Sequence, residues 1–123
     1  MCIRDRGVSV WDVSPNGNTM IGDYYASGSS ITLRWTNGAV AALGPGAGRA
    51  TSADGSVVVG SNNGVATVWN STGAHTVASL LGATSDLSGW TLEFANDVSD
   101  NGKVVVGNGK HNGVSEGWIA HLP

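Results

Sequence analysis

Carboxylates are the side chains in this 123-residue chain best suited to chemistry. Asp12 and Asp97 each stand two residues before the serine of a recurring motif, and Glu93 lies shortly before Asp97. Two carboxylates at a defined separation are what glycoside hydrolysis requires. An aspartate beside a turn, however, commonly accepts hydrogen bonds from nearby backbone amides, and matching positions indicate a repeated structural device. We therefore predict no catalytic residue.

Metal ligands are the second kind of chemistry to consider. His75, His111 and His121 occupy unrelated positions, and none has a partner at a spacing typical of metal sites. The segment 97–102 has some of the alternating oxygen ligands of a calcium loop but lacks the closing glutamate. Cys2 is the only cysteine. We expect no metal and no cofactor.

Five tryptophans fall into two groups. Trp11 and Trp90 do not recur between repeats, and exposed aromatic rings on a neutral surface rich in Asn and Ser are suited to binding carbohydrate. The other three follow the repeats, so we predict that they are core anchors: Trp35, Trp69 and Trp118.

The elements that must position these side chains come from one motif present three times. It runs Ser-x-Asn/Asp-Gly, continues into an apolar run and ends in glycine, at residues 14–22, 52–60 and 99–107. Asn-Gly and Asp-Gly favour a two-residue hairpin turn with positive φ, and the β-branched run that follows predicts a short buried strand. Recurrence at about 40 residues indicates a repeat architecture.

Each unit reads as up to four short antiparallel strands, which is the make-up of a propeller blade. We predict an all-β fold, a partial β-propeller of about three blades, with a β-trefoil as the alternative. The expected units are residues 7–46, 47–90 and 91–123, with no helix longer than two turns. Because a closed propeller has at least four blades, further blades would be missing from this chain.

The repeats also predict which residues are buried and which lie at the rim. Besides the three recurrent tryptophans, the expected core comprises Val57, Val59, Val104 and Val106. The turn residues should be exposed and bonded to amides of their own hairpin: Asn16, Asp54 and Asn101.

The first six residues, Met1 to Arg6, resemble a translated sequencing adapter and are set aside. On this interpretation the natural amino terminus lies upstream. Without their two arginines and one aspartate, the formal net charge changes from −3 to −4.

Composition narrows the classes of function. Charged residues are 12% of the chain and glycine supplies 19 positions, which is typical of a turn-rich all-β domain. There is no basic stripe for nucleic acid and no apolar segment of the roughly 18 residues that a membrane helix needs. The abundance of Gly, Ser, Thr and Asn indicates an extracellular protein.

The pattern Val-Ser-x-Asp/Asn-Gly-x-x-Val-Val-Gly resembles the HAF-type repeats of bacterial extracellular proteins. The closing segments 87–92, 95–102 and 116–120 resemble the last such repeat, although the His-Ala-Phe triplet of the family is absent. The resemblance implies a β-propeller-like domain of a secreted or surface protein. It favours a non-enzymatic module for ligand recognition, adhesion or matrix assembly, with a carbohydrate or another surface protein as partner. The alternative is a fragment of a propeller glycoside hydrolase.

Overall fold

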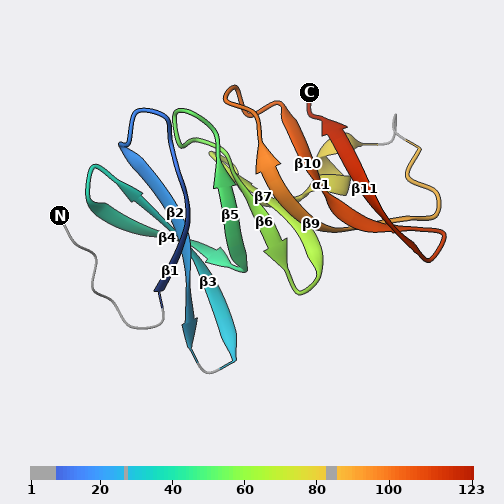
Figure 1. The fold of residues 1–123 in the computed structure, drawn as a ribbon, viewed down its shortest axis with the longest axis horizontal. Coiled ribbons are helices and arrows are strands. Elements are labelled where there is room, and N and C mark those ends of the chain that lie inside the picture. Colours follow the sequence, from blue (N-terminus) through green and yellow to red (C-terminus); the bar gives the residue numbers. More distant parts are fainter. Residues whose placement is uncertain (1–7, 27, 83–85) are drawn as a thin grey trace.

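The chain folds into three antiparallel sheets that follow one another in sequence order (Figure 1). A computed structural model describes residues 8–26, 28–82 and 86–123, so the adapter-like residues 1–6 lie outside the described part. Eleven strands and one short helix make up the described residues. The all-β class expected from the sequence is confirmed.

Each sheet is a meander in which consecutive strands are neighbours. The first contains β1 (Val8–Val13), β2 (Thr19–Ala26), β3 (Ser29–Thr36) and β4 (Ala39–Pro45). The second contains β5 (Ala47–Thr51), β6 (Val58–Asn62), β7 (Val65–Asn70) and β8 (Gly73–Thr76), followed by helix α1 (Val77–Leu81). The third contains β9 (Trp90–Val98), β10 (Val104–His111) and β11 (Val114–His121). None of these sheets closes into a barrel within the described ranges.

The three motif copies form one kind of loop, but not the two-residue turn that the sequence predicted. In the first copy the Ser14 amide donates to the Thr19 carbonyl at 2.8 Å, and the Ser14 hydroxyl accepts the Thr19 amide at 3.1 Å. Four residues lie between them, and only Gly17 has positive φ. The same bonds recur from Ser52 and Ser99. The serine is needed because its hydroxyl replaces a backbone acceptor in the wider loop.

Two-residue turns with positive φ at both positions occur at other hairpins. They are Asn37-Gly38 between β3 and β4, Asn63-Gly64 between β6 and β7, and Asn112-Gly113 between β10 and β11. Asparagine tolerates the left-handed region better than most residues, which accounts for this pairing.

The motif residue before the loop glycine behaves as predicted. The side-chain oxygen of Asn16 accepts the amide two residues later at 3.0 Å, and Asp54 and Asn101 do the same at 3.0 and 2.9 Å. All three are exposed at the rim.

The glycine that ends each motif lies opposite a β-bulge. Register shifts leave Trp11 in β1, Arg49 in β5 and Asn96 in β9 without a partner. The facing glycines are Gly22, Gly60 and Gly107, and a Cβ added to any of them would lie within 2.0 Å of a backbone carbonyl oxygen. The bulge therefore requires glycine at the end of the motif.

The core lies between adjacent sheets. Ile21 of the first sheet packs with Val58 and Trp69 of the second, and a larger cluster joins the second sheet to the third. Trp35, Trp69 and Val59 are buried as expected, whereas Val57 and Val104 are half-buried.

Two core predictions were wrong. Val106 is 38% exposed, because it lies on the face of the third sheet that no other sheet covers. Trp118 is half-buried and pairs with Gly107, whereas Trp35 and Trp69 pair with Met20 and Val58. The position equivalent to these tryptophans is held by Ala120, so Trp118 is displaced by two residues along its strand.

Replacing Gly60 with alanine should destabilise the fold by about 3 kcal/mol or more, because the new methyl group would lie 2.0 Å from the Ala47 carbonyl oxygen. Gly117→Ala is the matched control, since its added Cβ would meet its nearest atom at an ordinary 3.7 Å. Urea unfolding measures both. Equal midpoints for the two variants would contradict the role assigned to the bulge glycine.

Acid should weaken the second motif loop through Asp54. Hydrogen bonds from the Ser56 hydroxyl, the Ser56 amide and the Ser52 hydroxyl lower the pKa of Asp54 to about 2, from an ordinary 3.8. Its stabilising contribution is therefore complete above pH 3.8 and is lost as the pH falls toward 2. Thermal melts across this range should show a steeper loss for wild type than for Asp54→Asn, which keeps a neutral acceptor. Identical acid limbs would refute this assignment.

Candidate functional site

The three bulges project three unlike side chains from the first strands of the three sheets. Strand β5 packs beside both β1 and β9, so these strands are neighbours across the sheet boundaries. We call their unpaired residues, Trp11, Arg49 and Asn96, the bulge row. It is the set of equivalent positions at which the backbone is the same and the side-chain chemistry differs.

The first two members of the bulge row form a cluster with Asp23. The Trp11 indole Nε1–H donates to Asp23 Oδ1 at 2.9 Å. The Arg49 guanidinium carbon lies 4.1 Å from the centre of the Trp11 ring, which is cation–π geometry. Arg49 Nη1 is 3.9 Å from Asp23 Oδ2. The cluster thus joins the first sheet to the second, and the Trp11 residue stays 50% exposed.

One nitrogen of this cluster retains a free donor. Arg49 Nη1 is shielded from solvent, yet no acceptor of the described chain is within hydrogen-bonding distance of it. A buried donor without an acceptor is unfavourable, so an acceptor brought by a ligand would be stabilised there.

The third sheet repeats the arrangement with amides. The Asn96 side-chain amide donates to Asn108 Oδ1, as Trp11 donates to Asp23. Asp23, Ser61 and Asn108 each directly follow the motif glycine. Sequence reasoning missed Arg49, although the signal was present: each bulge residue stands three positions before the motif serine.

The carboxylates considered as catalytic are held separately by backbone amides. Asp12 accepts the Val13 amide at 2.9 Å with one oxygen and the Thr51 amide at 3.0 Å with the other. Asp97 accepts the Val98 amide at 2.9 Å. The Asp12 carboxylate therefore links the first strands of two sheets.

Glu93 lies apart from these two contacts. It lines a shallow hollow of about 350 Å³ on the third sheet together with Glu116, a residue that the sequence did not single out. Glu116 Oε2 is 3.2 Å from His111 Nδ1. The ring of His111 also stacks on Trp90, with centroids 4.4 Å apart, so one face of that indole is covered.

The remaining histidines do not assemble a metal site. His75 Nε2 is 2.7 Å from the Thr72 hydroxyl, and His121 is exposed at the end of β11. Across the described ranges, no three His, Cys, Asp or Glu side chains gather closely enough to hold a metal ion.

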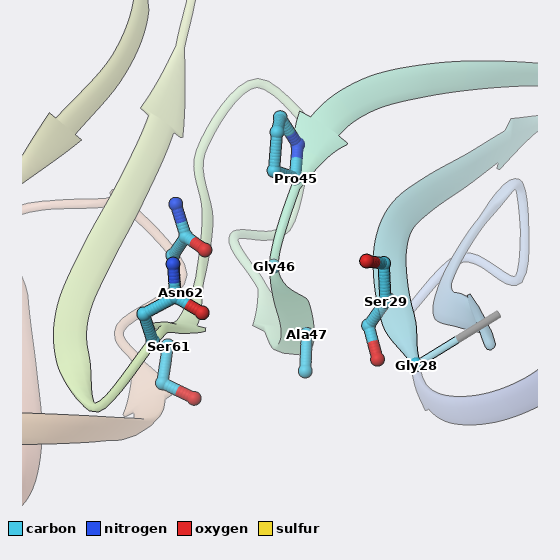
Figure 2. A pocket seen from close by; sticks show the side chains of 9 residues that line it. Gly28, Ser29, Pro45, Gly46, Ala47, Ser61 and Asn62 are labelled. Atoms are coloured by element: carbon cyan, nitrogen blue, oxygen red, sulfur yellow. The ribbon is translucent and has the colours of Figure 1, made fainter. Parts of the chain in front are cut away.

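A second hollow, of about 260 Å³, adjoins the middle of the bulge row (Figure 2). Ser61 and Asn62 lie on one side of the segment connecting β4 to β5, and Gly28 and Ser29 lie on the other. The Gly46 amide in that segment already donates to the Ser30 carbonyl, and its carbonyl accepts the Thr32 hydroxyl. The hollow therefore offers only short hydroxyl and amide side chains.

No known protein family, curated protein or solved structure matches this chain. Within the described residues, no helix has the length and apolar character needed to cross a membrane.

If Asp12 is a structural acceptor, Asp12→Ala should lower the free energy of unfolding by about 1–3 kcal/mol, because the Thr51 amide loses its partner between two sheets. Asp97→Ala is the matched control, since it removes one amide bond within its own strand, at an exposed residue. Urea unfolding compares the two. Equal losses would show that the link between the sheets does not stabilise the fold.

Proposed function

We propose that this chain is a non-enzymatic recognition module of propeller-like architecture that works outside the cell. The observation that carries the proposal is the bulge row. Three equivalent backbone positions, fixed by the same bulge and the same glycine, carry Trp11, Arg49 and Asn96. A constant frame with variable side chains is how repeat proteins build binding surfaces.

Carbohydrate is the ligand class that fits these side chains best. The half-exposed indole of Trp11 offers an apolar ring on which a sugar can stack. Beside it are the unsatisfied Arg49 nitrogen and the Asp23 carboxylate, which suit a ring of hydroxyl groups as donor and acceptor. A few polar groups around an aromatic ring are the usual composition of a small-ligand site.

The propeller-like architecture is supported by the order of the sheets and by the resemblance to HAF-type repeats. Successive meanders pack face to face, and their first strands are neighbours, as in the inner strands of a propeller. The low content of charged residues supports a place outside the cell.

The enzymatic alternative, a glycoside hydrolase using Asp12, Asp97 or Glu93, has less support. A catalytic carboxylate must be available to the substrate, whereas both oxygens of Asp12 are occupied by backbone amides.

Substituting Trp11 by alanine tests the proposal. The wild-type chain should bind members of a panel of neutral and acidic oligosaccharides in titration calorimetry, and Trp11→Ala should weaken that binding about tenfold or more. Trp90→Ala is the matched control, because its indole is on the third sheet and stacks on His111. Absence of binding to the whole panel, or equal binding by wild type and Trp11→Ala, would refute a carbohydrate site at the bulge row.

A further inference from the structure

The first and third sheets each leave one apolar face without a covering sheet. On the third sheet, Phe94, Val106 and Ile119 are 47%, 38% and 61% exposed. Pairing places them on the side opposite the buried Val105 and Ala120. We call this the open face of the third sheet.

The open face of the first sheet is the side opposite the buried Ile21. It carries four large apolar residues that are 40–59% exposed: Val10, Tyr24, Ile31 and Val40. In the interior of the chain, the corresponding faces of neighbouring sheets cover one another.

A contact repeated inside the chain shows what each open face would accept. A Cβ added to Gly55 would lie 2.7 Å from the Thr19 hydroxyl, and one added to Gly102 would lie 2.8 Å from a methyl group of Val57. The loop glycine of each following sheet thus abuts the residue after the loop in the preceding sheet. Gly17 has no atom within 4 Å. Its counterpart would be Val104, the equivalent of Thr19 and Val57 on the third sheet.

A backbone hydrogen bond gives a second, independent match. The Ala53 amide of the second sheet donates to the Asp100 carbonyl of the third at 3.0 Å. The first sheet cannot donate the equivalent bond, because Pro15 has no N–H. In the described chain the Asp100 amide and the Pro15 carbonyl both lack such a partner. A third sheet followed by a first sheet could therefore form this bond.

We propose that the open face of the third sheet binds the open face of the first sheet in a second copy of this chain, and that two copies close head to tail into a ring. The inference rests on the proposed propeller-like architecture. Propellers have about four to eight blades. One copy supplies three sheets, two copies supply 2 × 3 = 6, and three copies would exceed the range. The occupant is thus one further copy.

The oligomeric state of the whole chain tests this inference. Light scattering after size exclusion should give the mass of a dimer at micromolar concentration. Ile119→Asp and Val40→Asp should each give monomers, because each buries a carboxylate in both contacts of the ring. Both residues are about 60% exposed in the single chain, so circular dichroism should show that each variant remains folded. Val65→Asp, at a 42% exposed valine of the middle sheet, is the matched control and should stay dimeric.

Mixing the two monomeric variants tests the direction of the contact. Ile119→Asp keeps an intact first-sheet face and Val40→Asp keeps an intact third-sheet face, so the mixture should form a one-to-one pair. A monomeric wild type, or loss of the dimer in only one of the two variants, would overturn head-to-tail assembly. A monomer that still binds oligosaccharide through Trp11 would refute the assembly and leave the proposed function intact.

Discussion

The close approach of a backbone carbonyl to a glycine is the constraint on which this fold depends. At Gly22, Gly60 and Gly107 the facing carbonyl oxygen stands within 2.0 Å of where any side chain would begin. Only glycine allows the first strand of each sheet to bulge at this point. The bulge increases the local twist of that strand and leaves one residue unpaired. The repeated motif thus ends in glycine for a reason that lies on the neighbouring strand.

Polar groups in this protein serve mainly to satisfy the backbone. The motif serines complete their loops with a hydroxyl, and Asn16, Asp54 and Asn101 cap the amides that those loops leave free. Asp12 extends the same use across a sheet boundary. A chain with 12% charged residues can therefore hold three small sheets without ion-pair networks. This local satisfaction leaves the bulge row free to vary in chemistry.

Assembly and recognition draw on the same repetition. Each sheet presents one face to the sheet before it and another to the sheet after it, and the contacts between loop glycine and following residue recur at both internal boundaries. A series of this kind has two complementary ends unless it closes. The bulge row crosses these boundaries, since Arg49 of the second sheet stacks on Trp11 of the first. Recognition would therefore depend on how neighbouring sheets are held together.

The sequence alone determined the all-β class, the motif loops and the role of Asn16, Asp54 and Asn101, because those interactions close within a few residues of the chain. It did not determine the type of loop, since the serine hydroxyl that widens it competes with the two-residue turn that Asn-Gly favours elsewhere. The displacement of Trp118, the exposure of Val106 and the meeting of Trp11 with Arg49 were decided by tertiary structure. Each depends on strand register or on which sheet lies opposite, and the free energy of such contacts comes from partners distant in sequence.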